Sequence, residues 1–367
     1  MIILGIETSC DETAASLIEA DDKNIIVLSN IVSSQIALHS KWGGVVPNLA
    51  AREHLKNILP VIETALEKAE KNSADIDLIA VTNGPGLIPA LLIGTTTAKA
   101  LAYFWKKPLI GIHHIEGHIY ANFIRDEISA ISNSQFLIPK QNPNPKFPIL
   151  CLVVSGGHTQ LILMREHLDY EIIGETLDDA VGEAFDKVAR ILGLGYPGGP
   201  AVAKIADEFS SATIADEFKI TLPRPMIKSA NFDFSFSGIK TAVLYAVKKN
   251  QENLKNKNYI SAMCQEFQTA VIDVLIHKAI NAAKKYQPKT ILLAGGVSAN
   301  QKLREQLGLA IEKNVPNTNY KIPDIKYSLD NSAMIAVAGY FRWKKNKNKK
   351  ELEKNWQSLE ADASLKL

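Results

Sequence analysis

Cysteine is scarce and scattered in this chain. Among its 367 residues there are three cysteines, Cys10, Cys151 and Cys264, which lie far apart in the sequence. Three distant cysteines make neither a disulfide framework nor a cysteine-based zinc motif. A protein without disulfides fits a reducing compartment, so we expect a cytoplasmic protein.

Long apolar runs are also missing. No stretch approaches the roughly 18 consecutive apolar residues that a membrane helix needs. The first 22 residues contain neither lysine nor arginine, whereas a secretory signal starts with basic residues and a transit peptide is rich in arginine. We therefore expect a soluble protein that carries no targeting segment and has no membrane partner.

Neither sign of charge is in large excess. The 41 lysines and arginines are balanced by 39 aspartates and glutamates, which leaves a net charge of +2. A protein that binds nucleic acid over a broad surface is usually more basic, so any nucleic-acid contact should be local. At roughly 150 residues per domain, the length allows two domains or two lobes.

Three common catalytic motifs are absent or out of context. The chain has no GxxxxGK[ST] sequence, which excludes a P-loop enzyme, and Ser155 lacks the GxSxG surroundings of a hydrolase nucleophile. Residues 193–198 match GxGxxG literally, but they follow a predicted helix and contain Pro197. A dinucleotide-binding turn follows a strand, so this match predicts no such site.

What is present is an alternation of apolar strands and helices, which predicts an α/β protein. Residues 2–18 and 147–164 each read as a strand, a polar turn and a second strand, which suggests a duplicated unit. In 49–70, the spacing of Leu55, Leu59 and Ile62 predicts one apolar helix face. Further strands are expected at 78–86 and 108–112, helices at 88–105, 179–192 and 331–343, and a strand, glycine turn and helix at 289–307.

The sharpest local pattern is HHIEGH at 113–118. His114 and His118 are four residues apart, so on a helix they share one face and can bind one transition metal. The alternative is a pair of surface histidines. Glu116 would point about 200° away from the first histidine, which removes the base that a zincin protease needs. Asp330 is a candidate third ligand, with a helix N-cap as its alternative.

Two glycine turns are candidate anion sites. Residues 155–159 (SGGHT) lie between apolar strands, and Gly295-Gly296 follow a strand and open a helix near Asn300. Glycines let the backbone approach a ligand and direct N–H groups at an anion, although a tight structural turn is the alternative. Glu12 lies in the polar turn after the first strand. Catalytic acids often occur at strand ends, and the alternative is a solvent-exposed acid without a catalytic role.

Eight segments together resemble one family. They are GIETSCDETA (5–14), GGVVPNLAAREH (43–54), HHIEGH (113–118), VSGGHTQL (154–161), GETLDDAVGEAFDKVARILGLGYPGGP (174–200), FSFSGIKTAV (234–243), AGGVSANQKLR (294–304) and SLDNSAMIA (328–336). The chain resembles the TsaD (Gcp/YgjD) family of tRNA threonylcarbamoyladenosine transferases, in its bacterial form. The resemblance covers about residues 2–340 in order, apart from 125–147.

The resemblance implies the two-lobed fold of the actin, Hsp70 and sugar-kinase group, with duplicated ribonuclease-H-like cores and a ligand cleft between them. On this basis we expect a first lobe at 1–112, with 325–343 packing back onto it. The second lobe would span 113–324 with an insertion at 125–147. Residues 344–367 are expected to form a charged, solvated tail.

The resemblance also implies residue roles. In the family, one divalent metal ion, iron or zinc, is held at positions matching His114, His118 and Asp330. The adenylate is held at positions matching Val153, Val154, Ser155, Gly156, Gly157, Asp186, Gly199 and Asn300. Glu12 is our candidate for proton removal, on its position alone.

The implied reaction transfers threonylcarbamoyl from threonylcarbamoyl-adenylate to the exocyclic amine of the adenosine 3′ of the anticodon. The tRNAs are those that read codons beginning with A, and AMP is released. The implied partners are a TsaB-like paralogue and a TsaE-like ATPase. The alternatives are an ATPase or sugar kinase of the same fold, a metalloprotease and a non-catalytic scaffold.

Overall fold

The computed structural model describes residues 1–124, 145–208, 218, 220–249 and 251–367. These residues form two compact units, each with its own sheet. The first unit holds the described residues up to 124 together with Pro323–Leu367, and the second runs from 145 to Ile322. Within the described ranges, every helix is too short or too polar to cross a membrane. The expected insertion lies outside these ranges, except for residues 145–147.

The first unit contains a five-stranded mixed sheet in the order β3-β2-β1-β4-β5. The hairpin β1–β2 and its neighbour β3 are antiparallel, while β4 and β5 run parallel to β1. The strands are β1 (Ile2–Glu7), β2 (Glu12–Ala20), β3 (Ile25–Ser34), β4 (Leu78–Gly84) and β5 (Leu109–His113).

The second unit repeats this topology. Its sheet has the order β10-β9-β6-β7-β8, in which β6, β7 and β8 are antiparallel and β9 and β10 run parallel to β6. The strands are β6 (Ile149–Val154), β7 (Thr159–Met164), β8 (Tyr170–Glu175), β9 (Thr290–Ala294) and β10 (Asn319–Lys321). The predicted duplication is confirmed, and both sheets have the strand order of a ribonuclease-H-like core.

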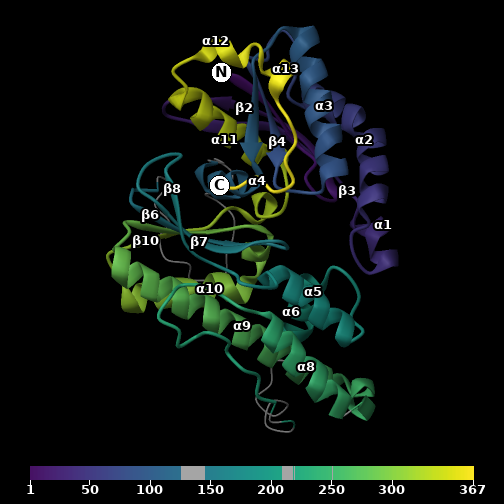
Figure 1. Ribbon diagram of the computed structural model, residues 1–367, viewed down its shortest axis with the longest axis vertical. Coiled ribbons are helices and arrows are strands. Elements are labelled where there is room, and N and C mark those ends of the chain that lie inside the picture. Colours follow the sequence, from purple (N-terminus) through teal and green to yellow (C-terminus); the bar gives the residue numbers. More distant parts are fainter. Residues whose placement is uncertain (125–144, 209–217, 219, 250) are drawn as a thin grey trace. The chain divides into compact units, whose positions relative to one another are not determined.

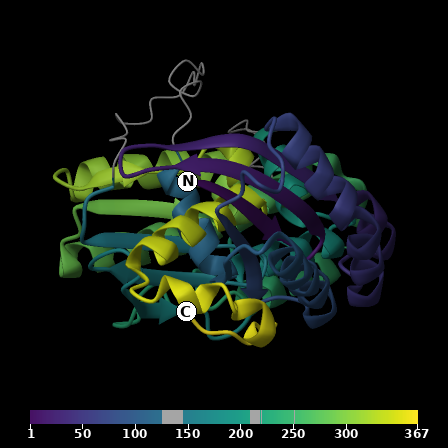
Figure 2. The same ribbon diagram turned by 90° about the horizontal axis from the view of Figure 1, so that it is seen from above.

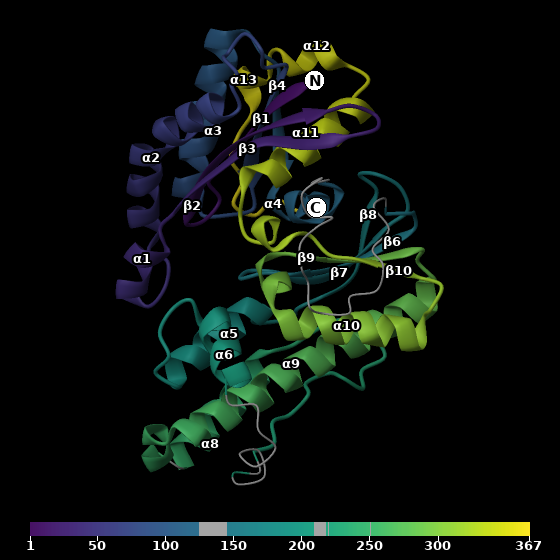
Figure 3. The same ribbon diagram turned by 180° about the vertical axis from the view of Figure 1, so that it is seen from behind.

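Helices cover both faces of the first sheet (Figures 1 and 3). Apolar residues of α2 (Pro47–Lys68) and α3 (Ile88–Trp105) pack on the face that carries Leu4 and Ile6. Helix α11 (Ser332–Lys345) contacts all five strands. The remaining short helices of this unit are α1 (Ile36–His39), η1 (Ser40–Trp42), α4 (His114–Tyr120), η2 (Ala121–Phe123), η6 (Ile325–Tyr327), α12 (Lys349–Leu352) and α13 (Asn355–Ser358).

Small residues let α11 lie directly on the sheet. A Cβ added to Gly5 of β1 would come within 2.2 Å of Ser332 O, and one added to Gly339 would come within 2.7 Å of Ala80 Cβ. Ser16 and Ser332 are also hydrogen-bonded through their hydroxyl groups. The start of α11 is therefore fixed against β1 and β2, and with it the loop that carries Asp330.

In the second unit the core lies between the sheet and a layer of helices. Leu150, Leu152 and Val154 of β6 belong to one apolar cluster with Phe185 and Phe267. The helices are α5 (Val181–Ile191), α6 (Gly198–Glu208), α8 (Ser237–Lys249), η4 (Gln251–Lys255), α9 (Lys257–Tyr286), η5 (Gly296–Ala299) and α10 (Gln301–Asn314).

The structure differs from the sequence-based expectations at three places. Leu55 and Leu59 of α2 are exposed, because the buried face of this helix lies about a quarter turn away. Residues 113–124 lie in the first unit, since α4 packs on α11. The segment 344–367 is not simply a solvated tail, because Leu352 is buried and Trp356 packs against the first core. In this segment, drawn yellow in Figure 2, α13 contacts α3 and β5.

Candidate metal centre and nucleotide site

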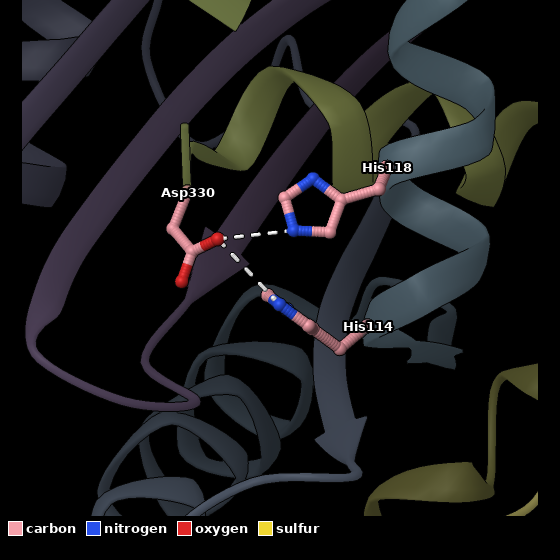
Figure 4. A group of neighbouring side chains, drawn as sticks. All are labelled: His114, His118 and Asp330. Atoms are coloured by element: carbon pink, nitrogen blue, oxygen red, sulfur yellow. Dashed lines mark ion pairs between the residues drawn. The ribbon is translucent and has the colours of Figure 1, made fainter. Parts of the chain in front are cut away.

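Two elements of the first unit bring two histidines and one carboxylate together (Figure 4). His114 and His118 lie one turn apart on α4, directly after β5, with ring centroids 4.7 Å apart. Asp330 Oδ1 lies 3.5 Å from His114 Nε2 and 3.1 Å from His118 Nε2. Asn331 is the residue that caps α11, through a hydrogen bond from Met334 N. Asp330 itself is therefore not used as a cap.

The donor atoms fit a first-row transition metal. The three side chains place one ligand atom each within 4.8 Å of one another. Tetrahedral ligands at zinc-like bond lengths stand about 3.3 Å apart, close to the distances measured here. Neither ring nitrogen of the buried His118 makes a hydrogen bond of good geometry, although Nε2 lies 3.1 Å from Asp330 Oδ1, so a cation between these two atoms would satisfy Nε2. A set of two imidazoles and one carboxylate suits zinc or iron.

Glu7 supports His114 from the end of β1. His114 Nδ1 lies 3.1 Å from Glu7 Oε2 and 3.2 Å from Ser9 Oγ. Thr82 Oγ1 and Ser9 N both donate hydrogen bonds to the fully buried Glu7 carboxylate. A carboxylate at Nδ1 fixes the ring tautomer and leaves Nε2 to bind a metal. Sequence analysis missed this role, although an acid in an otherwise apolar strand is a visible signal.

Charge coupling among these groups is strong. Burial alone would raise the pKa of Asp330, but the charge of His114 and the neighbouring His118 lower it to about 2. Burial alone would lower the pKa of His114, but Asp330 and Glu7 raise it to about 9. At neutral pH the metal-free cluster therefore holds a proton on His114 that a bound cation must displace.

Glu12, at the start of β2, is coupled to the same cluster. Its Oε1 accepts a hydrogen bond from Ser34 Oγ at 3.0 Å. Burial, followed by the charges of Asp330 and Asp11, raises the pKa of Glu12 to about 9. Without a cation beside Asp330, Glu12 is therefore protonated at neutral pH.

Glu116 is excluded as a protease base by its contacts. Its carboxylate is fully buried and receives two hydrogen bonds from Arg342 of α11, at 2.6 and 2.9 Å. This bidentate pair joins the helix that carries both histidines to the helix that follows Asp330. The expectation that Glu116 points away from the histidine pair agrees with this geometry.

In the second unit the two glycine turns follow adjacent parallel strands. Val153 of β6 pairs with Ala294 of β9, so the turns after both strands lie at the same edge of the sheet. A Cβ added to Gly295 would come within 2.4 Å of Val154 O, whereas a Cβ on Gly156 would meet no atom within 4 Å. The first turn therefore has open space beside its backbone, as an anion-binding turn requires.

The turn at Ser155 also contacts a helix start. Gly182 N donates to Ser155 O at 3.2 Å, so the beginning of α5 lies against this turn. Further along α5, Asp186 Oδ1 accepts a hydrogen bond from Gly198 N at 2.7 Å, next to Gly199. A helix N-terminus beside a glycine turn favours an anionic group.

Asn300 is held by two of its own hydrogen bonds. Its Oδ1 caps α10 by accepting from Leu303 N at 2.9 Å, and its Nδ2 donates to Gln268 Oε1 at 2.8 Å. Asn300 directly follows η5, which contacts β6 and β9, so it lies near the sheet edge that carries the turn at 153–157. Gln268 was not singled out from the sequence, where a glutamine within a helix carries no signal.

The fold and these residues define a class: a two-core α/β protein of the actin, Hsp70 and sugar-kinase group. One core carries a candidate metal cluster and the other carries glycine turns at its strand ends. Residues 26–337 match the family described as TsaD, tRNA N6-adenosine threonylcarbamoyltransferase. The chain belongs to this family, whose members are transferases.

Proteins of that name from several bacteria are similar over nearly the whole chain. The protein from Thermosipho africanus is 48% identical over 94% of this chain and 95% of its own length. The protein from Persephonella marina is 46% identical over 94% of this chain and 91% of its own length. The protein from Listeria welshimeri is 48% identical over 92% of this chain and 90% of its own length. A solved structure, YeaZ from Pseudomonas aeruginosa, aligns to 47% of this chain and 65% of its own, at 12% identity and a TM-score of 0.28. That score is too low to support any inference.

Proposed function

We propose that this chain transfers the threonylcarbamoyl group of threonylcarbamoyl-adenylate to N6 of the adenosine 3′ of the anticodon. Its substrates are tRNAs that read codons beginning with A, and AMP is the second product. Family membership supports the transferase reaction and the tRNA acceptor. The observation that carries the proposal is the cluster of His114, His118 and Asp330, in which His118 is buried. A sugar kinase or ATPase of this fold would not need such a cluster.

We assign one divalent ion, zinc or iron, to these three residues. When bound there it supplies Lewis acidity, which polarises or positions the acyl group. The protein's own part is to hold the ligands. Glu7 keeps His114 in the tautomer whose Nε2 is available for a metal. Because Asn331 caps α11, the Asp330 carboxylate is not needed as a helix cap.

The adenylate is assigned to the second unit. Backbone N–H groups of Gly156 and Gly157 bind the phosphate or stabilise negative charge on oxygen, while the N–H of Ser155 closes the turn by donating to His158 O at 2.8 Å. Val153 and Val154 support this turn. Asp186 and Gly199 bind the ribose side, and Asn300 contacts the nucleotide. The open space beside Gly156 and the helix start at the same turn support this assignment.

The transfer itself needs one proton acceptor. The amine nitrogen of the adenosine forms a bond to the carbamoyl carbon, and the bond from that carbon to the phosphate oxygen breaks. The electron pair of the broken bond leaves with AMP, and the amine loses one proton. We assign that proton to Glu12, because a cation beside Asp330 would lower its pKa from about 9 and leave a carboxylate.

We further propose that the chain works with a TsaB-like paralogue and a TsaE-like ATPase, in the cytoplasm where tRNA is modified. The net charge of +2 gives little general attraction for tRNA. Large apolar side chains are exposed on α2 and α3, among them Leu55, Leu59, Leu92 and Phe104. Large apolar side chains on the surface can contribute to a protein interface.

Nucleoside mass spectrometry tests the proposal. Unmodified tRNA is incubated with a threonylcarbamoyl-adenylate synthase, threonine, bicarbonate, ATP, the partners and this chain. We expect threonylcarbamoyladenosine with the intact chain and with His277→Ala, a control at an exposed histidine on α9. We expect little product with His114→Ala. Equal product from His114→Ala would remove the metal from the mechanism, and no product from any form, while a known transferase works, would refute the transfer.

A further inference from the structure

The end of the chain is fixed to the edge of the first sheet. We call residues 359–365 the C-terminal strap. Asn83 of β4 holds it by two hydrogen bonds: Nδ2 donates to Glu360 O at 3.2 Å, and Asn83 O accepts from Asp362 N at 2.7 Å. A Cβ added to Gly84 would lie 2.0 Å from Asp362 O. The strap therefore lies directly on the backbone at the end of β4.

Contacts just before the strap and at its first residue lead the chain to this place. The ring of Trp356 packs on Tyr103 of α3, with centroids 4.8 Å apart. Lys99 Nζ, also on α3, donates to Leu359 O at 3.1 Å. A Cβ added to Gly111 of β5 would come within 2.7 Å of Leu359 Cδ1. The path is thus specified by contacts with α3 and β5.

The strap ends at His113, the residue before the first candidate metal ligand. His113 Nε2 lies 3.0 Å from Leu365 O. His113 Nδ1 accepts a hydrogen bond from Ile115 N at 3.2 Å and so caps α4. A neutral imidazole that accepts at Nδ1 carries its proton at Nε2. The Leu365 carbonyl accepts a hydrogen bond from this Nε2–H group, so one tautomer satisfies both contacts.

We propose that the C-terminal strap positions the metal-binding helix α4 through His113. The carbonyl of Leu365 orients the His113 ring, the ring caps α4, and α4 carries His114 and His118. This inference rests on the proposed metal site, but it adds a positioning residue and a chain segment beyond the three ligands. Its physical basis is that α4 has only seven residues. Such a short helix gains its orientation from external contacts rather than from its own hydrogen bonds.

The consequence concerns ligand precision. Groups that orient metal ligands from outside the coordination shell typically change metal affinity by about 10–100-fold when they are removed. His113 contacts no metal ligand directly, since it caps the helix that carries the ligands. Its effect should therefore lie at the lower end of this range. We therefore expect about tenfold weaker binding when its contact with Leu365 is lost.

Four proteins test the inference: the intact chain, a chain ending at Ala363, His113→Asn in the full chain, and the combination. The shortened chain lacks Leu365 but keeps the contacts of Asn83. Asparagine at 113 retains a capping acceptor but is too short to reach Leu365. A chain ending at Lys366 is the control, because it keeps the Leu365 carbonyl within a peptide bond. Cobalt(II) is the metal probe, measured by calorimetry and by its visible absorption spectrum.

We expect each single change to weaken cobalt binding about tenfold and to alter the cobalt spectrum, with the Lys366 control unchanged. The combination should be no weaker than either single change, because both break the same connection. A general loss of stability would multiply the two effects. Unchanged affinity and spectrum in the single variants, or multiplied effects in the combination, would overturn the inference.

A second readout separates this inference from the metal assignment. Hydrogen exchange of the amides at 113–120 is measured on the metal-free proteins. The chain ending at Ala363 should exchange faster there than the intact chain, and equal rates would overturn the positioning role. If the intact chain binds cobalt no better than His114→Ala, the metal assignment fails, and the exchange rates alone decide whether the strap positions α4.

Discussion

The ion pair between Glu116 and Arg342 gives the sharpest stability prediction. The Glu116 side chain is 0% exposed and that of Arg342 is 39% exposed, and two hydrogen bonds join them. Replacement by Arg342→Met keeps most of the apolar contact of the arginine stem but leaves a carboxylate buried without its partner. Removing one member of a buried ion pair typically costs about 3–5 kcal/mol.

Partial exposure of Arg342 reduces the expected cost. Water reaches the guanidinium side of the pair, so we expect the free energy of unfolding to fall by about 2–3 kcal/mol in Arg342→Met. Glu116→Gln should cost less, because the arginine can turn to solvent. The double variant should cost at least about 1 kcal/mol less than the sum of the two single changes, since neither charge is then left alone.

Urea unfolding followed by tryptophan fluorescence measures this cost. All four tryptophans, Trp42, Trp105, Trp343 and Trp356, belong to the first unit, so their fluorescence follows the unit that contains the pair. The experiment is done with a chelator present, because a bound metal would add its own stabilisation.

The matched control is Lys344→Met, two residues further along α11. Lys344 pairs with Asp22 at 2.6 Å, but the side chains are 54% and 78% exposed. An exposed pair is worth under about 1 kcal/mol. A cost for Arg342→Met as small as that of Lys344→Met would refute the reasoning, and so would additive costs in the double variant.

Three further predictions follow from contacts described above or nearby. Glu7→Gln should weaken cobalt binding about 10–100-fold, measured by calorimetry. The neutral amide no longer fixes the tautomer in which His114 Nδ1 carries the proton and Nε2 binds the metal. Gly5→Ala should destabilise the first unit by about 1–3 kcal/mol in thermal unfolding, since its Cβ meets a backbone oxygen of α11 at 2.2 Å, while Gly238→Ala should not. Burial would raise the pKa of Asp178, but hydrogen bonds from two serines and two backbone amides lower it. Solvent exposure limits its contribution to under about 1 kcal/mol. That contribution is fully present above the unfolded pKa of about 4 and is lost as the pH falls through the lower folded pKa, so Asp178→Asn should cost more stability at pH 7 than at pH 3.

The sequence predicted the strands, turns and helices that depend only on neighbouring residues. The two apolar hairpins became β1–β2 and β6–β7, and the strand-turn-helix pattern at 289–307 became β9, η5 and α10. Such elements are visible because apolar spacing and glycine turns are local properties. The spacing of His114 and His118 is local in the same sense.

Contacts between distant segments were not predictable in this way. The Leu55 and Leu59 stripe predicted the wrong buried face of α2, because the burial of a helix depends on which neighbour it meets. The lysines at 344–350 suggested a solvated tail, yet Trp356 and Leu359 beyond them pack on the first unit. The resemblance to a family assigned Asp330 to the candidate metal cluster, whereas its position at a helix start alone favoured a helix cap.

The supporting contacts explain why the ligand residues alone are an incomplete description of the site. His114 depends on Glu7 of β1, α4 is tied to α11 by Glu116 and Arg342, and His113 connects α4 to the end of the chain. The supporting partners Glu7, Arg342 and Leu365 all lie more than 100 residues away from α4 in the sequence. They act through three different residues, His114, Glu116 and His113. A change in any of them should therefore alter metal affinity without touching a ligand. Loss of affinity on changing all three, with the ligands intact, would mean that precision at this cluster is a property of the whole first unit and not of the HHIEGH segment.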